Sequence, residues 1–315
     1  MTSLRIMQPA PAASGDNPPD VRERIQRFCA SASFEVAAKD FAGLQAASGF
    51  MPPGSAVSIT WLPNETNATR IAAAVAIRKA GFEPVPHVAA RRLESVEALD
   101  RLLQGLRDEA GATQALLIAG DIDHAHGPFP SSLQVLQSGA FERAGFTNVG
   151  FGGHPEGHPS VDRAMLDSEM DAKIARASQG GMASFVVTQF CFASEPILAW
   201  TQAFRQRHPT VPVRIGLAGP ASLKTLMRFA ALCGVGTSAK AIIGRGASLA
   251  RLLTESGPDP VIKDLATSAA FETLGPIGLH LFPFGGLART AEWNAKVVAG
   301  RFQLRPAESG FQIDK

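Results

Sequence analysis

The sequence predicts an α/β protein built as one (β/α)8 TIM barrel with extra helices before the last strand. Three observations support this fold class. Short runs rich in β-branched and aromatic residues alternate with longer segments of helical period, the pattern of βα units in a parallel sheet. There are eight such runs, and 315 residues with 45% hydrophobic content can bury one large core. Eight strands that are each tied to a helix fit a closed barrel, because a barrel leaves no strand as an edge.

The expected strands are short apolar runs bounded by turn residues. In chain order they are SASFEVA (31–37), AVSITWL (56–62), EPVPHVA (83–89), QALLIAGD (114–121), NVGFGG (148–153), SFVVTQFCF (184–192), PVRIGLAG (212–219) and GLHLFPFG (278–285).

Amphipathic segments between these strands predict helices. Many open on a Ser, Asn or Asp that can cap a helix, and several close on Gly. We expect two further helices in residues 236–276, including SAKAIIGRGASLARLLT (238–254), as a decoration on the barrel. The main helical segments are NATRIAAAVAIRKAG (67–81), SVEALDRLLQGLRDEAG (95–111), VDRAMLDSEMDAKIARAS (161–178) and SLKTLMRFAALCGV (222–235).

The start of the chain, MTSLRIMQPAPAASGDNPPD, is rich in Pro and Ala and lacks the continuous apolar core of a signal peptide. We therefore expect a flexible N-terminal tail over residues 1–20 and a single catalytic barrel domain over residues 21–315. No apolar run reaches the roughly 18 residues of a membrane span. These features predict a cytoplasmic protein that does not bind a membrane.

Composition restricts the partners. The net charge of +2 and the absence of a Lys/Arg-rich run argue against nucleic acid and anionic membranes, so the expected partner is a small molecule. The three cysteines are widely separated and form no CxxC pair, which argues against structural zinc and a disulfide framework. We also expect a homo-oligomer.

Polar residues lie in or directly after the ends of six successive expected strands, at the barrel end where catalytic groups gather. A single Glu, His or Asp at such a position is often a solvated strand end, a hydrogen-bonded core residue or a turn. Six polar positions at the same level are harder to explain by packing alone. They are Glu35, Thr60, His87, Asp121, the group His154, Glu156 and His158, and the pair Thr188 and Gln189.

The segments HAHGPFP and HPEGHP suggest a metal site with His124, His126, His154 and His158 as ligands. Both segments are loop-like and lack the HExxH spacing that places two histidines on one helix face. We therefore predict no metal.

The strand-end motifs resemble those of the flavin-dependent methylenetetrahydrofolate reductases, which are (β/α)8 barrels. The resemblance extends over about residues 31–302, and it depends on the order and spacing of short motifs rather than on any one of them. The motifs are SFEVAAKD, ITWLPNET, PVPHVAAR, LLIAGD, HPEGHP, a helix bearing Lys173, and VVTQFCF.

The resemblance implies FAD as cofactor and a folate as substrate. Glu35 would be the general acid that protonates a folate nitrogen as the five-membered ring opens or forms. Asp121 would lie near flavin and pterin, and Gln189 would hydrogen-bond the pterin, since an amide both donates and accepts. The other implied cofactor contacts are Thr60, His87, Gly120, His154, His158 and Lys173, the last as a point charge on the pyrophosphate.

Several departures from the family pattern bear on the reductant. Ala119 stands where the family has an Arg, and His154 where it often has a Tyr. Leu223 occupies the position of an aromatic residue that stacks on nicotinamide or folate, a contact worth about 1 kcal/mol. Arg289 is the nearest residue that could replace the usual Arg on the glutamate tail. We therefore expect a protein that binds FAD and folate but uses NADH poorly, and that oxidises 5-methyltetrahydrofolate with another electron acceptor.

Two other classes remain open. A flavin-free, pterin-dependent methyltransferase barrel would share the folate-sized mouth but need a corrinoid or thiol partner. A non-catalytic folate-binding barrel is the second alternative. Glu35, Asp121 and Gln189 together argue against that second class, because an inactive scaffold has no physical need for all three groups.

Overall fold

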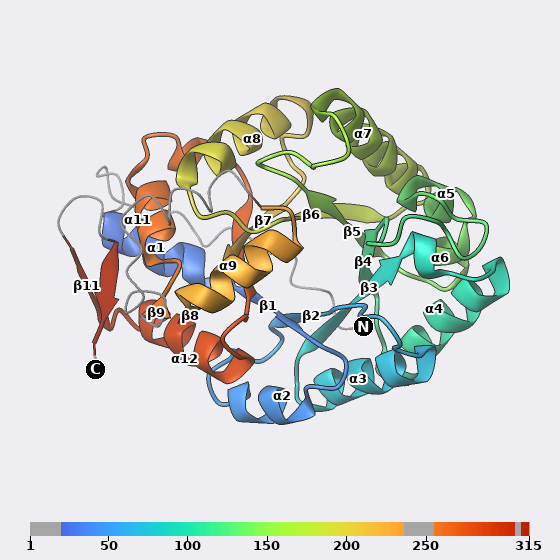
Figure 1. Cartoon of the computed structure of the whole chain (residues 1–315), viewed down its shortest axis with the longest axis horizontal. Helices are drawn as coiled ribbons and strands as arrows, with labels where there is room; N and C mark the ends of the chain where they lie inside the picture. The colour runs from blue at the N-terminus through green and yellow to red at the C-terminus, as the bar shows by residue number, and fades with distance from the viewer. Residues whose placement is uncertain (1–19, 236–254, 306–309, 315) are drawn as a thin grey trace.

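The computed structural model describes residues 20–235, 255–305 and 310–314, and it contains a closed parallel barrel (Figure 1). Neighbouring strands around the barrel follow the order β1-β10-β7-β6-β5-β4-β3-β2. All eight strands expected from the sequence are present, so the (β/α)8 prediction is confirmed. The barrel strands are β1 (Ser33–Val36), β2 (Ala56–Ile59), β3 (Glu83–Ala89), β4 (Gln114–Ile118), β5 (Asn148–Gly153), β6 (Ala183–Thr188), β7 (Val213–Ala218) and β10 (Ile277–Phe282).

Helices surround the barrel and begin on polar caps. The side chains of Ser95, Asp162 and Ser222 each accept a hydrogen bond from the backbone N–H three residues later, which satisfies one free donor of a helix start. The helices are α1 (Val21–Ala30), α2 (Phe41–Ala47), α3 (Asn67–Lys79), α4 (Val96–Ala110), α5 (Ser132–Gln137), α6 (Ala140–Arg143), α7 (Arg163–Gln179), α8 (Ser194–Arg207), α9 (Leu223–Leu232), α11 (Asp259–Thr267) and α12 (Leu287–Val298).

Alternation along the strands divides the apolar residues into two layers. Outward-facing residues such as Phe34, Val57 and Ile215 pack against the helices in the main core. Inward-facing residues, including Val85, Leu116 and Val187, form a smaller separate cluster inside the barrel. The inside of the barrel is thus partly apolar, and the polar side chains that share it occupy a water-poor space.

The segment before the last barrel strand differs from its prediction. Residues 236–254, which contain the expected helix SAKAIIGRGASLARLLT, lie outside the described residues. The described remainder forms α11 and the short 3-10 helix η3 (Phe271–Thr273). A two-stranded ribbon of β8 (Ala221–Ser222) and β9 (Glu255–Ser256) was not expected from the sequence. The predicted tail, residues 1–20, is described only at Asp20.

The chain ends in an antiparallel hairpin of β11 (Phe302–Leu304) and β12 (Phe311–Ile313), also absent from the prediction. The Asp259 carboxylate accepts a hydrogen bond from the Phe311 N–H at 3.3 Å and ties the hairpin to α11. Burial raises the pKa of Asp259 to about 6, because the charged form loses its water.

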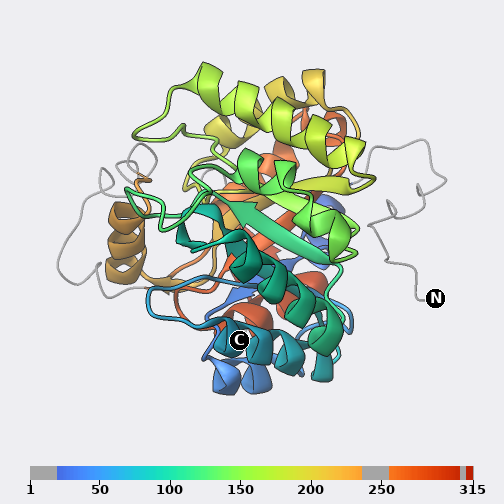
Figure 2. The same ribbon diagram turned by 90° about the vertical axis from the view of Figure 1, so that its right-hand side faces the viewer.

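Helix α9 lies across the end of the barrel at which the strands terminate (Figure 2). Its residues Met227, Phe229 and Ala230 pack with phenylalanines that follow β6 and β10. The rings of Phe229 and Phe284 are stacked with centroids 4.0 Å apart. This aromatic cluster packs at the barrel mouth beside the ends of β6 and β10. In the described part of the chain, no helix has the length and apolar character needed to cross a membrane.

Candidate active site at the carboxyl end of the barrel

Glu35 lies inside the barrel between two histidines from different strands. Its Oε2 is 3.4 Å from the His87 Nε2 on β3 and 3.7 Å from the His280 Nε2 on β10. The Glu35 side chain is 13% exposed and that of His280 is fully buried. Neither Nε2 atom has a hydrogen-bond partner among the described residues. One carboxyl oxygen therefore faces two buried ring nitrogens, with water largely excluded.

Ser33 holds the other nitrogen of the His280 ring. The Ser33 hydroxyl lies 2.8 Å from the His280 Nδ1 and 3.3 Å from the Leu279 carbonyl, to which it can donate. The contact with Ser33 fixes the orientation of the ring, and the His280 Nε2 lies on the side of Glu35. Two groups that can each take up or give up a proton therefore lie side by side inside the barrel.

His87 is held as a neutral ring. Burial lowers its pKa to about 4, and although the Glu35 charge opposes this shift, the nearby Arg70 and His280 add to it. The Arg70 guanidinium donates to the backbone carbonyls of both His87 and Thr60. Arg70 itself is completely buried and lies over the Trp61 ring at 4.0 Å. This arginine fixes the ends of β2 and β3 beside Glu35.

The depressed pKa of His87 predicts acid sensitivity. A histidine whose folded pKa lies below its unfolded value stabilises the fold above pH 6.5, and this contribution is lost as pH falls toward the folded value of about 4. We expect the free energy of unfolding to fall by about 2 kcal/mol between pH 7 and pH 5 on this account. Urea unfolding at both pH values checks it.

The control for this pH effect is the His87→Gln variant, which keeps a neutral polar group and should lose less stability in acid. The comparison with wild type is needed because Asp259 acts in the opposite direction. Its raised pKa stabilises the fold below its ordinary value of 3.8, and this is lost as pH rises through about 6. An equal acid loss in wild type and variant would contradict the assignment to His87.

Asp121 follows β4 and is paired with an arginine that follows β3. Both the Nε and the Nη2 of Arg92 bond the Asp121 Oδ1, at 3.1 and 2.6 Å. The turn requires glycine at the preceding position, since Gly120 has a φ of 99°. The Asp121 side chain is 72% exposed and has no contact with Glu35 among the described interactions. The structure thus brings Asp121 to the mouth but joins it to Arg92.

Gln189 and two histidines line a cavity of about 100 Å³ between the ends of β5 and β6. The His154 and His158 rings meet edge to face, 5.3 Å apart. Burial lowers the pKa of His154 to about 4, and the charge of His158 adds to the shift. The Gln189 Oε1 accepts the Phe190 N–H at 3.1 Å, and within the described ranges the amide NH₂ keeps its two donors.

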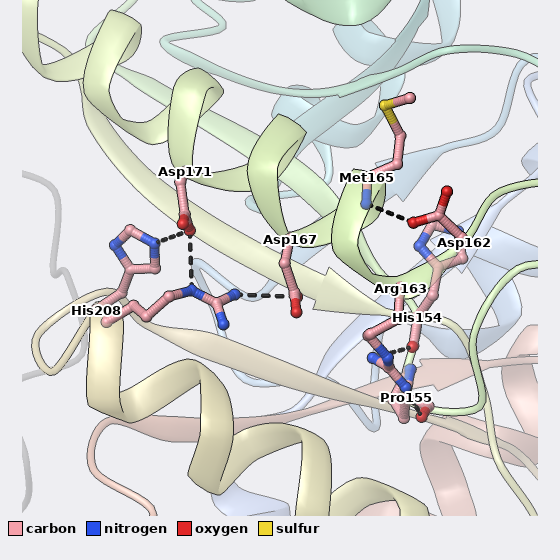
Figure 3. Close-up of polar contacts among 9 residues, drawn as sticks. His154, Pro155, Asp162, Arg163, Met165, Asp167, Asp171 and His208 are labelled. Atoms are coloured by element: carbon pink, nitrogen blue, oxygen red, sulfur yellow. Dashed lines mark hydrogen bonds and ion pairs between the residues drawn. The ribbon is translucent and has the colours of Figure 1, made fainter.

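The loop that carries these histidines is fixed at its base by the start of α7 (Figure 3). Arg163 donates to the backbone carbonyls of His154 and Pro155, at 3.1 and 2.9 Å. Asp162 caps the helix by accepting from the Met165 N–H at 2.8 Å. Farther along α7, an ionic cluster joins the helix to α8 through Asp171 and His208, 2.7 Å apart. The backbone that positions His154 is therefore rigidly supported.

Lys173, on the inner face of α7, lines a second cavity of about 50 Å³ together with Gly152, His154 and Trp200. Its ammonium lies over the Phe151 ring at 5.6 Å. Burial lowers the pKa of Lys173, and the Glu169 charge partly offsets the shift. Among the described residues it forms no ion pair, so the ammonium can accept an anionic partner.

The remaining predicted site residues, Thr60, Leu223 and Arg289, have no described contact with Glu35 or Gln189. The Thr60 hydroxyl donates to the Val36 carbonyl at 3.3 Å, between β1 and β2. Leu223 is 6% exposed in the first turn of α9, and Arg289 is exposed in the first turn of α12. Thr188 was wrongly expected at the mouth: it is 1% exposed, and its hydroxyl accepts the Gly216 N–H at 2.8 Å, joining β6 to β7.

Of the four histidines in the metal hypothesis, His154 and His158 lie together, with 5.3 Å between their ring centroids. His124 and His126 are exposed in the loop after β4. In the part of the chain that the structure describes, no group of three or more His, Cys, Asp or Glu side chains could hold a metal ion.

Sequence reasoning missed four residues that support the site. They are Ser33 and His280, which orient Glu35, and Arg70 and Arg92, which hold the ends of β3 and β4. A usable signal existed for His280, because it lies in an expected strand at an inward-facing position. Ser33, Arg70 and Arg92 can be recognised as site residues only once the strand register shows which residues lie beside them.

Comparison with known proteins gives an independent view of the chain. Residues 47–246, more than half of the chain, match the family model of methylenetetrahydrofolate reductase. Among solved structures, the fold is similar to an uncharacterized protein from Clostridium thermocellum that binds two copies of 5-methyl-5,6,7,8-tetrahydrofolic acid. The two are 13% identical, with a TM-score of 0.55, covering 85% of this chain and 92% of the other.

A second protein, from Anabaena variabilis, is provisionally described as a sugar phosphate isomerase/epimerase. It is 9% identical over 80% of this chain and 84% of its own, and its TM-score of 0.30 is too low to carry an argument. The family match extends over the strand-end residues Thr60, His87, Asp121, His154 and Gln189, on a barrel of the expected topology. The chain therefore belongs to the methylenetetrahydrofolate reductase family.

Proposed function

We propose that this protein catalyses the FAD-dependent interconversion of 5,10-methylenetetrahydrofolate and 5-methyltetrahydrofolate, and that it favours oxidation of the 5-methyl form with poor use of NADH. The observation that carries the proposal is the Glu35 carboxyl group inside the barrel, 3.7 Å from the Nε2 of His280, whose ring is held by Ser33. Opening or closing the five-membered ring of the folate requires a proton to be given to or taken from a ring nitrogen. A largely buried carboxyl group beside a buried histidine can exchange that proton without access to bulk water.

The folate side of the site is provided by Gln189 and its cavity. The free NH₂ group of Gln189 can donate to a pterin edge, while the neighbouring His154 stays neutral at pH 7 and adds no charge. The structurally similar protein from Clostridium thermocellum, which binds 5-methyltetrahydrofolate on the same kind of barrel, makes a reduced folate a reasonable ligand for this fold.

The residues at β5 and α7 fit the cofactor that the family uses. Lys173 is a largely buried cation with no ion pair among the described residues, and such a group is suited to a diphosphate. His87 also offers a buried Nε2 without a hydrogen bond. We propose that Lys173 holds the FAD diphosphate, with Thr60, His87, Gly120, His154 and His158 along the flavin. Bound there, the flavin would exchange a hydride with the folate methyl or methylene carbon.

The proposed low use of NADH depends on Leu223. Its side chain is aliphatic and buried in the first turn of α9, so it offers no aromatic face to a nicotinamide ring. Stacking on such a face contributes about 1 kcal/mol beyond burial. The absence of that contact at Leu223 lowers the affinity for NADH without affecting Glu35 or Gln189.

An anaerobic visible spectrum of the FAD-loaded protein tests the proposal. We expect 5-methyltetrahydrofolate to bleach the flavin bands and NADH to leave them almost unchanged. Rapid bleaching by NADH would contradict the proposed preference for oxidation of 5-methyltetrahydrofolate. The protein would then be a methylenetetrahydrofolate reductase that uses NADH. A protein that binds the folate but takes up no FAD would instead be the flavin-free methyltransferase barrel. Binding of both ligands without any bleaching would indicate a barrel that binds folate without catalysis.

The role of Lys173 gives a separate prediction. Lys173→Met keeps the aliphatic stem and its packing but removes the charge, so we expect the dissociation constant of FAD to rise by at least about tenfold. Quenching of flavin fluorescence during titration of the apoprotein measures it. The control is Lys296→Met on α12, whose ammonium pairs with Glu292 at 3.2 Å one turn earlier on the same helix, and which should bind FAD as wild type does. Equal affinities in all three proteins would place the diphosphate elsewhere.

A further inference from the structure

We propose that Arg92 is a positioning residue that holds Asp121 by one oxygen and neutralises its charge at the barrel mouth. The inference rests on the proposed function, because it concerns the flavin and the pterin that Asp121 would face. Its basis is the ion pair itself: the Nε and Nη2 of Arg92 reach the same Oδ1 at 3.1 and 2.6 Å. Arg92 would thereby fix both the orientation and the effective charge of the carboxylate.

The two partners of this ion pair differ in exposure. The Arg92 side chain is 10% exposed and that of Asp121 is 72% exposed. The cation is therefore part of the barrel wall, whereas the anion projects from it. Both bonds from the guanidinium end on Oδ1, so in the part of the chain that the structure describes the Asp121 Oδ2 can still accept a hydrogen bond. A pterin amino group could bond this oxygen without breaking the ion pair.

Asp121 also offsets the positive charges of Arg92 and the nearby Arg70. The neighbouring Arg70 is bound by carbonyl groups, and burial lowers its pKa to about 10, with the Arg92 charge adding to this effect. Asp121 is the carboxylate that bonds Arg92. The ion pair with Asp121 therefore stabilises Arg92 beside the buried cation Arg70. Breaking the pair would leave two neighbouring cations without a carboxylate, so we expect Arg92 to stay bound to Asp121 when a ligand is present.

The adjacent arginine holds the same loop in a different way. Arg91 donates to the carbonyls of Pro130 and Ile122, both at 3.1 Å, and its backbone N–H and C=O bond Ala119 and His126. Arg91 thus fixes the backbone of the loop after β4, whereas Arg92 bonds the carboxylate. These two consecutive arginines lie on the 3-10 helix η1 (Ala90–Arg92). Arg91 supports the backbone of the loop, and Arg92 supplies the positive charge beside Asp121.

The charge of Asp121 matters for the direction of the reaction. Oxidation of 5-methyltetrahydrofolate breaks a methyl C–H bond and passes the hydride, two electrons and one proton, to the flavin. The methylene carbon then bonds the second folate nitrogen, which releases its proton to Glu35 or water. Reduced flavin carries a negative charge at neutral pH, so a free carboxylate beside it would oppose this step. A carboxylate neutralised by Arg92 opposes it less, and the bound flavin becomes the better electron acceptor.

Three variants separate the charge of Arg92 from its geometry: R92Q, R92K and R91Q. The first measurement is the ratio of reduced to oxidised flavin at a fixed potential, set by a redox dye, in the FAD-loaded protein. The second is the dissociation constant of 5-formyltetrahydrofolate, a reduced folate that carries no methyl hydride. The third is the thermal midpoint of unfolding. Each variant is compared with wild type under the same salt.

We expect R92Q to lower the ratio of reduced to oxidised flavin about fivefold and to weaken folate binding about tenfold. R92K should restore the flavin ratio, because it restores the charge, but not the affinity, because lysine cannot bond Oδ1 twice. R91Q should lower the thermal midpoint and leave the other two measurements near wild type.

Two results would overturn the inference while leaving the proposed function intact. One is an R92Q protein with wild-type flavin ratio and folate affinity. The other is an R91Q protein that matches R92Q in both measurements, because the arginines would then act only through the loop. A wild-type protein that takes up no FAD and binds no 5-formyltetrahydrofolate would overturn the proposed function, and the role of Arg92 with it.

Discussion

Replacing Glu35 with glutamine will lower folate turnover about 100-fold, the usual loss when a general acid or base is removed, while the protein keeps its flavin. Glutamine has nearly the size of glutamate and retains an oxygen toward the two Nε2 atoms of His87 and His280, which lie 3.4 and 3.7 Å from the carboxylate. Packing inside the barrel is therefore preserved. The variant lacks the carboxyl group that takes up a proton from the folate nitrogen when the ring closes and returns it when the ring opens.

The measurement is single-turnover stopped-flow spectroscopy of the FAD-loaded protein with 5-methyltetrahydrofolate, together with the spectrum of the bound flavin. A matched control is Glu65→Gln in the loop after β2. The Glu65 carboxylate accepts the Leu62 N–H at 3.0 Å, and a glutamine oxygen can accept the same bond. We expect this control to turn over at the wild-type rate. Unchanged turnover in Glu35→Gln would show that Glu35 is not the acid.

The sequence predicted the barrel because each of its eight strands is locally recognisable. A run such as QALLIAGD is apolar, short and followed by turn residues, and the order of such runs is sufficient for a βα repeat. The hairpin β11–β12 and the ribbon β8–β9 were missed for the opposite reason. Their strands have two or three residues each, and residues this few carry no periodicity.

At the site, the sequence pointed to single residues but not to the pairs that they form in the structure. Glu35 and His87 were identified by type and position, but His280 lies opposite Ser33 only through the register of β1 and β10, far apart in sequence. That register depends on the closed barrel and is not encoded in either segment alone. The same applies to Arg92 and Asp121, which meet through two loops.

Strand geometry could have corrected the prediction that the adjacent residues Thr188 and Gln189 both point into the barrel mouth. Consecutive residues of a strand face opposite sides, so both cannot point into the mouth. Thr188 faces β7 and bonds the Gly216 N–H, while Gln189 lines the cavity with His154. Neutral polar residues in an apolar run therefore had two causes here, one structural and one linked to the site.

Replacing Arg70 with leucine will lower the free energy of unfolding by about 3 kcal/mol, among the larger effects of a single substitution. Arg70 is 0% exposed, and its guanidinium donates to the carbonyls of Thr60 and His87. Leucine leaves both carbonyls without these donors in a water-poor region, and each unsatisfied buried group costs about 1–3 kcal/mol. It also removes the contact with the Trp61 ring.

Urea unfolding at pH 7.5 measures this loss, with Arg101→Leu as the control. Arg101 is an exposed residue of α4, so its replacement should change stability by no more than about 0.5 kcal/mol. Because Arg70 holds the carbonyl of His87, its loss should also loosen the end of β3 and weaken FAD binding in the folded protein. Equal stability of the two variants would mean that water replaces the guanidinium at these carbonyls, and that the ends of β2 and β3 are held by the barrel's own hydrogen bonds.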